Sequence, residues 1–107
     1  MNNITQELIE EKGLLSDPSR WTKGHLARDA NGVPIDYFSK SAVCWCQTGA
    51  SYSLNSISET RWLKNTVAKT YGVSTAMDFN DRPNTTHEML MKFYDECIEE
   101  SKRFNWL

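Results

Sequence analysis

A thiol, an imidazole and a carboxylate occur in short segments of this chain, and together they could support nucleophilic catalysis. Cys46 is the candidate nucleophile, His87 the candidate base and Asp81 the carboxylate that would orient the base. This set suits group transfer, because the base removes the thiol proton and the carboxylate fixes the imidazole. A small cysteine-dependent hydrolase or transferase is therefore one hypothesis. The alternative is that Cys46 is a packed core thiol, since free cysteine is among the most buried residue types.

The thiols and imidazoles are not spaced as metal ligands. Zinc sites pair their ligands as Cys-x2-4-Cys or His-x3-5-His, whereas Cys44 and Cys46 are separated by one residue and would diverge on a helix. Lys23, Arg28 and Arg82 lie near turns, but the chain has no glycine-rich phosphate loop and no dinucleotide fingerprint. We therefore expect neither a metal nor a cofactor.

Aromatic and charged residues of the same segments could instead form a protein-binding surface. Exposed aromatic side chains concentrate binding energy, and Trp21 follows a turn while Trp106 lies next to the last residue. The candidate binding residues are Trp21, Arg28, Asp29, Trp45, Asp81 and His87. The alternative is structural: Arg28 would pair with Asp29 or Asp81, and Trp21 would pack, so that the loop carrying them is held against the helices.

Composition narrows the class of protein. A chain of 107 residues is long enough for one core but too short for two, so we expect one domain over residues 1–107. The net charge of −2 offers no field that would attract nucleic acid or an anionic membrane. The first residues lack the basic and apolar regions of a signal peptide, and three cysteines, an odd number, favour reduced thiols. We expect a cytoplasmic protein with no direct nucleic-acid or membrane partner.

Hydrophobic spacing predicts the first half of the chain as two helices around a loop. Residues 4–15 carry an apolar stripe, with Glu7 and Glu11 expected on the opposite side. Residues 21–36 lose that period and contain an Asn-Gly turn signal, which predicts a small hairpin or an ordered loop. Residues 41–54 return to helical spacing with a face of small residues, which predicts a central helix.

Two capping boxes predict the helices of the second half. Ser56 to Glu59 would open a helix that ends at Gly72, with Trp62 on its buried stripe. Thr85 to Glu88 would open the longest helix. The predicted fold is a mainly α single domain of about four helices, with a small hairpin or ordered loop after the first.

Three segments of the chain resemble those of a family of small uncharacterised proteins of phages and bacteria, classed as a domain of unknown function. The family pattern is Trp-Thr-x-Gly-x-x-Ala-Arg-Asp, then Ala-Val-x-Trp-Cys-x-x-Gly-Ala, then Trp-Asn-Asp-x-Pro-x-x-Thr-His. Matching segments begin here at Trp21, Ala42 and Phe79, with Phe79 in place of the third segment's tryptophan. The resemblance covers about residues 4–100 and implies a shared fold unit, but no reaction and no ligand.

Small size, spare aromatic residues and the lack of a catalytic signature favour a binding role over catalysis. We expect a phage-type accessory protein that binds a host protein or complex, for example an anti-defence or anti-CRISPR inhibitor, in the host cytoplasm. The hydrolase or transferase built on Cys46, His87 and Asp81 remains the alternative. The sequence leaves the oligomeric state open.

Overall fold

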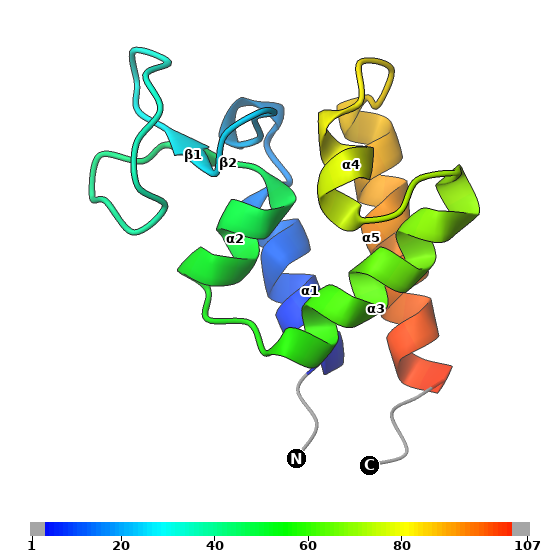
Figure 1. The fold of residues 1–107 in the computed structure, drawn as a ribbon. Helices are drawn as coiled ribbons and strands as arrows, with labels where there is room; N and C mark the ends of the chain where they lie inside the picture. Colours follow the sequence, from blue (N-terminus) through cyan, green and yellow to red (C-terminus); the bar gives the residue numbers. More distant parts are fainter. Residues whose placement is uncertain (1–3, 104–107) are drawn as a thin grey trace.

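The longest helix, over residues 87–103, packs along the first helix, over residues 4–14. The computed structural model describes residues 4–103, and the predicted contribution of Trp106 lies outside them. Residues 4–103 form five α-helices, two 3₁₀ helices and two short strands, and Figure 1 shows how the helices and strands are arranged. Their bounds are α1 Ile4–Leu14, η1 Pro18–Arg20, β1 Ala27–Arg28, β2 Cys44–Trp45, α2 Gln47–Ser53, α3 Ser58–Ala68, η2 Lys69–Tyr71, α4 Ala76–Asp81 and α5 His87–Arg103. The fold is mainly α, with one helix more than the four expected.

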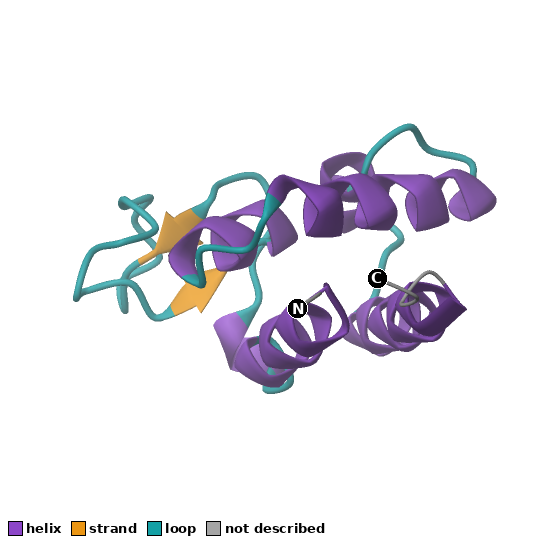
Figure 2. Cartoon of the chain, turned by 90° about the horizontal axis from the view of Figure 1, so that it is seen from below, coloured by secondary structure: helices purple, strands orange, loops and turns teal. Residues whose placement is uncertain are grey.

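The helices enclose a single apolar core. Figure 2 shows α1 and α5 side by side, with the remaining helices in a second layer and the strands at one end. Leu8 of α1 and Leu90, Phe93 and Tyr94 of α5 are fully buried in this core. Phe79 of α4 stacks on Phe93 with ring centroids 4.7 Å apart, which fastens α4 to α5.

The predicted helix over residues 41–54 is wrong in its first half. Residues 44–45 form β2, which pairs antiparallel with β1 so that Ala27 faces Trp45 and Arg28 faces Cys44. The helix begins after Cys46, whose backbone is extended and whose thiol accepts a hydrogen bond from the Gly49 amide. Residues 44–45 form a strand because they pair with residues far away in the sequence. The local spacing that predicted a helix carries no information about such a partner.

Gly49 explains why α2 can lie against the loop that precedes β1. A Cβ at this position would stand 1.9 Å from the Leu26 carbonyl oxygen, a distance no side chain tolerates. At Gly49 the predicted need for a small residue on this helix is confirmed, and the segment that lies against it is the backbone of Leu26.

The predicted helix ends need two corrections. Ile57 precedes α3 without a side-chain cap, because the Ser56 hydroxyl donates instead to the Glu11 carboxylate. At α5 the hydroxyl that caps the helix belongs to Thr86, which accepts from the Met89 amide, and not to Thr85. Gly72 is confirmed as the stop after α3 and η2, since its φ of 83° is left-handed.

Three side chains lie on different sides of their helices from those predicted. Trp62, placed on the buried stripe of α3, is 64% exposed. Glu11 of α1, predicted on the side opposite the apolar stripe, is fully buried, and Glu7 is half-buried.

The helix α4 was not predicted, and its N-cap is Thr75, whose hydroxyl accepts from the Asp78 amide.

Candidate functional site

The three segments singled out in the sequence meet in space, as predicted. The Trp21 indole donates to the Asn80 side-chain oxygen at 2.7 Å, and the Thr22 amide donates to the Trp45 carbonyl. The rings of Trp21 and His87 lie 5.9 Å apart. We call the residues that join here the motif cluster: Trp21, Lys23, Arg28, Asp29, Trp45, Asn80, Asp81 and His87.

Asn80 is the centre of the motif cluster, and the sequence did not single out its role. Its side-chain oxygen accepts from the Trp21 indole and from the Gln47 amide. Its side-chain nitrogen donates to the Thr22 carbonyl and to the Asp81 carboxylate. One fully buried amide thus ties the first segment, the start of α2 and the end of α4 together.

The expected ion pair of Arg28 is wrong. Its guanidinium donates to the Thr22 hydroxyl and to the carbonyls of Lys23 and Gly32. Within residues 4–103, no carboxylate lies within ion-pair distance of it. All the oxygens that accept from Arg28 are neutral and belong to its own loop. Arg28 therefore holds the loop in place, as expected, but through neutral partners in place of a carboxylate.

Both aspartates of the motif cluster hold backbone instead. The Asp29 carboxylate accepts from the amides of Asn31 and Val33 and so forms the predicted turn, in which Gly32 has a φ of 80°. The Asp81 carboxylate accepts from the Gly24 amide and from Asn80. Both bonds to Asp81 end on its Oδ1, so this oxygen holds the Gly24 backbone and the Asn80 side chain and bonds to no imidazole.

Lys23 joins the first segment to the third by a second route. Its ammonium group donates to the carbonyls of Arg82 and Thr85, and it lies 5.3 Å from the centroid of the Trp21 ring. With a third bond to the Pro83 carbonyl, the Lys23 ammonium group ties three backbone carbonyls of the third segment to the first. From the sequence, this residue was considered only as a phosphate ligand.

The three candidate catalytic residues do not bond to one another among the contacts described. Cys46 and Asp81 line one small pocket together with His25, while His87 does not line it. The His87 ring nitrogen lies 2.7 Å from the Leu15 carbonyl, so it is engaged with the loop after α1. No three histidine, cysteine or acidic side chains of residues 4–103 converge as metal ligands.

The environment of Cys46 opposes its use as a nucleophile. Its side chain is 3% exposed, and burial raises the pKa of the thiol despite hydrogen bonds from the Gly49 and Thr48 amides. A raised pKa keeps the sulfur as the thiol, whereas the nucleophile in cysteine enzymes is the thiolate. The contacts of Cys46 fit its position as the cap of α2.

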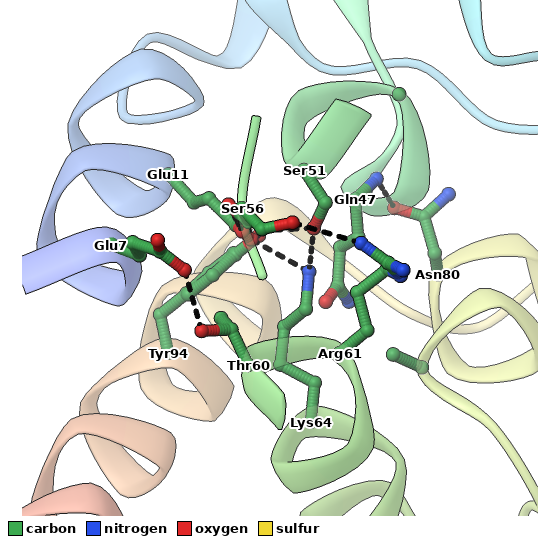
Figure 3. A network of polar contacts seen from close by, with 12 residues as sticks. Glu7, Glu11, Gln47, Ser51, Ser56, Thr60, Arg61, Lys64, Asn80 and Tyr94 are labelled. Atoms are coloured by element: carbon green, nitrogen blue, oxygen red, sulfur yellow. Dashed lines mark hydrogen bonds and ion pairs between the residues drawn. The ribbon is translucent and has the colours of Figure 1, made fainter. Parts of the chain in front are cut away.

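A second polar cluster lies inside the helical layers, and no role was predicted for it. We call it the buried network: Glu11, Ser51, Ser56, Lys64 and Tyr94. Figure 3 shows these side chains converging from α1, α2, α3, α5 and the connection between α2 and α3. Glu11 accepts from Lys64 at 2.6 Å, from Ser51 and Ser56 at 2.8 and 2.7 Å, and from Tyr94 at 2.9 Å.

The buried network is fully enclosed, because Glu11 is 0% and Lys64 2% exposed. Lys64 also donates to the Ser51 hydroxyl at 2.6 Å. Burial and the neighbouring Glu11 carboxylate raise the pKa of the Tyr94 phenol well above its usual value, which keeps it a hydrogen-bond donor. The signal for this network was in the spacing, since Leu8, Glu11 and Leu15 share one helical face.

Three large aromatic side chains, of which Phe38 and Tyr52 are exposed and Tyr37 is half-buried, lie next to the motif cluster. We call Tyr37, Phe38 and Tyr52 the aromatic face. The Tyr37 ring lies 5.3 Å from each of the other two rings, and Phe38 is 71% exposed. The Arg61 guanidinium covers the Tyr52 ring at 5.4 Å. The indole of Trp45 donates to the Tyr37 carbonyl, so the motif cluster holds this face in place.

A family profile matches residues 2–100 of the chain, that of the family of unknown function DUF6197. The chain belongs to this family. No curated protein and no solved structure matches it. Membership of DUF6197 establishes a shared sequence unit over nearly the whole chain and assigns it no reaction or ligand. No helix of residues 4–103 has the length and apolar character needed to cross a membrane.

Proposed function

We propose that this DUF6197 protein is a non-enzymatic binding module that uses the aromatic face to hold a host protein or protein complex. The observation that carries this proposal is the exposure of Phe38 within a cluster of three rings, of which Tyr37 is held by a bond from the Trp45 indole to its backbone carbonyl. Exposed aromatic rings in a fixed arrangement bind with little loss of side-chain entropy, which makes them effective interface residues.

The motif cluster has a supporting role in this proposal. Its polar groups bond to each other and to backbone, so few remain for a partner, and its indole at Trp45 sets the position of Tyr37. Of the predicted binding residues, we therefore assign Trp45 to positioning the face, and Arg28 to holding the loop between Thr22 and Gly32. The partner we favour is a component of a bacterial defence system, CRISPR complexes included, with the protein acting as a phage-encoded inhibitor.

Catalysis by Cys46, His87 and Asp81 is the weaker alternative. It would require the thiol to lose its proton in a buried site and His87 to leave the Leu15 carbonyl. Iodoacetamide distinguishes the two functions, because alkylation needs an accessible thiolate. We expect Cys46 to be protected until the protein unfolds, and alkylation of the folded protein near neutral pH would favour the enzyme.

Affinity capture from a lysate of the bacterial host tests the binding proposal. The bait is the intact protein, compared with the variants Phe38→Ser and Tyr52→Ser and with Trp62→Ser. Trp62 is the matched control because it is an exposed aromatic on α3 that makes no ring contact with the aromatic face. We expect a partner that the intact protein and Trp62→Ser retain and that both face variants lose. A partner lost with Trp62→Ser and retained by the face variants would overturn the assignment.

A further inference from the structure

The pocket that Cys46 and Asp81 share lies between the loop before β1 and the helix α4. Its volume is about 250 Å³. Clefts that enclose a small-molecule ligand usually measure about 300 to 1,000 Å³, so this pocket has room for one side chain. Its lining residues are Gly24, His25, Leu26, Cys46, Met77 and Asp81. Leu26, Cys46 and Met77 give it apolar walls, and Asp81 contributes a carboxylate.

The carboxylate of Asp81 is held in place through one of its two oxygens. Its Oδ1 accepts from the Gly24 amide at 3.0 Å and from the Asn80 side-chain nitrogen at 2.7 Å. No hydrogen bond from a residue between 4 and 103 ends on its Oδ2. Because two donors fix the first oxygen, the second is left as an oriented acceptor at the pocket.

The charge of Asp81 is not balanced by an ion pair. None of the ion pairs within residues 4–103 includes this carboxylate. Lys23 lies nearby in the loop, but its ammonium group bonds to backbone carbonyls of the third segment. Burial raises the pKa of the Cys46 thiol and the charge of Asp81 adds to this rise, so the field of the carboxylate reaches into the pocket. The pocket therefore favours a cation.

The single free oxygen selects an ammonium group over a guanidinium group. A guanidinium binds a carboxylate best through two parallel bonds, one to each oxygen, and Oδ1 of Asp81 already has two donors. A lysine ammonium is a compact point charge that can bond to one oxygen. The methylene groups of lysine pack on apolar surface, here that of Leu26 and Met77.

The pocket is continuous with the aromatic face. His25 and Leu26 line both this pocket and a wider cleft whose lining includes Tyr37. A partner that covers the aromatic face and this cleft can therefore place one long side chain in the pocket. We propose that the pocket receives a lysine side chain of that partner, with its ammonium group donating to Oδ2 of Asp81. This inference rests on the binding role proposed above and makes Asp81 a residue that contacts the partner.

Butylammonium, which has the methylene chain and the charge of a lysine side chain, tests the pocket without any partner. The intact protein is titrated at constant ionic strength, and NMR follows the Met77 methyl group and the Gly24 amide. We expect saturable shifts of both signals, and none with 1-butanol, which lacks the charge. Tighter binding of butylguanidinium would overturn the choice of lysine. The absence of a saturable shift with butylammonium would overturn the site.

A charge-neutral variant of Asp81 tests the contact. Asp81→Asn keeps an oxygen that can accept from Gly24 and Asn80, so we expect a folded protein. It should bind butylammonium about tenfold or more weakly, the loss expected for a hydrogen bond to a charged group. Asp78→Asn, an exposed aspartate of α4 outside the pocket lining, should bind as the intact protein does. Unchanged binding by Asp81→Asn would contradict the contact.

A second pair of variants leaves the bonds of Asp81 untouched. Met77→Lys places an ammonium group one helical turn before Asp81, where it can pair with the free oxygen. Met77→Gln changes the same wall of the pocket without adding charge. We expect Met77→Lys to bind butylammonium about twofold or more weakly than Met77→Gln does. Equal binding by the two variants would show that the charge of Asp81 does not hold the ligand.

Capture of the partner separates failure of this inference from failure of the binding role. In the capture experiment described above, Asp81→Asn should retain less partner than the intact protein, and Asp78→Asn should retain as much. A partner lost with Phe38→Ser but fully retained by Asp81→Asn would leave the binding role intact and overturn the lysine contact. A partner that Phe38→Ser retains would instead contradict the binding role at the aromatic face, on which this inference rests.

Discussion

The buried network and the aromatic face reverse the usual placement of residue types. In the first, a carboxylate and an ammonium group lie inside the helical layers at 0% and 2% exposure. In the second, Phe38 projects into solvent at 71% exposure. Each placement has a cost in solvation free energy. A buried charge needs an opposite charge and hydrogen bonds to replace its lost hydration, and an exposed aromatic ring lacks the hydrophobic stabilisation that burial would give.

The two regions differ in whether contacts within the chain offset this cost. Glu11 receives four hydrogen bonds from other parts of the chain, so the buried network is complete within one molecule. The rings of the aromatic face contact each other and Arg61, yet leave Phe38 open. We infer that the network selects one packing of the helices, whereas the aromatic face is left for a partner.

Removal of one charge from the buried network gives the largest expected effect. Lys64→Met leaves the Glu11 carboxylate buried without its cation, and we expect the free energy of unfolding to fall by about 3 to 5 kcal/mol. Urea unfolding measures the change, and Lys69→Met, an exposed lysine in η2, is the matched control. The double variant Glu11→Leu with Lys64→Met should recover much of the loss, since no unpaired charge then remains. A loss below about 1 kcal/mol for Lys64→Met would contradict a closed network.

A substitution in the motif cluster gives the next largest effect. Asn80→Ala leaves the Trp21 indole and the Gln47 amide without acceptors, and we expect a loss of about 2 kcal/mol in unfolding free energy. Asn84→Ala, an exposed asparagine in the following turn, should change stability by about 0.5 kcal/mol or less. Equal stabilities of the two variants would show that Asn80 does not organise the cluster.

Alkaline pH should weaken the helical core gradually. Burial raises the pKa of Tyr94, of Tyr71, which also bonds to Glu96, and of the Cys97 thiol. The unfolded chain titrates these groups from about pH 8.5 for cysteine and about pH 10 for tyrosine. Above those values the unfolded state has released protons that the folded state keeps, so the free energy of unfolding falls as pH rises. Urea unfolding from neutral to alkaline pH checks this, and a constant or rising stability would contradict the burial of these groups.

The smallest expected effect on stability lies at the aromatic face. Phe38→Ser should change the unfolding free energy by about 0.5 kcal/mol or less, because little of the ring is buried. A loss of more than about 2 kcal/mol would mean that the ring is part of the core and is unavailable to a partner.

The sequence predicted the helices whose stripes are long and whose ends carry local signals. The stop at Gly72 and the turn around Gly32 both need a left-handed backbone, which glycine adopts readily. A single glycine is therefore enough to predict each of them from the sequence. The first half of the predicted helix over 41–54 failed because Cys44 and Trp45 pair with a strand sixteen or more residues away. No window of neighbouring residues contains that partner.

For the candidate site, the sequence predicted which segments meet but not what their side chains do. Trp21, Trp45 and His87 do lie in one cluster. The partners of Arg28 were predicted from charge alone. In the structure, the guanidinium instead bonds to backbone carbonyls of its own loop. The buried network was missed because charged residues are rarely buried, although Glu11 falls on the apolar face of α1.

Site-specific photo-crosslinking tests whether the protein meets its partner at the aromatic face. Benzoylphenylalanine is placed at position 38 in one protein and at position 92, an exposed residue of α5, in another. Both are irradiated in lysate of the bacterium proposed as host, and the crosslinked products are identified by mass spectrometry. We expect a discrete product with one host protein from position 38 and none from position 92. No product from position 38, or the same product from both positions, would contradict binding at that face.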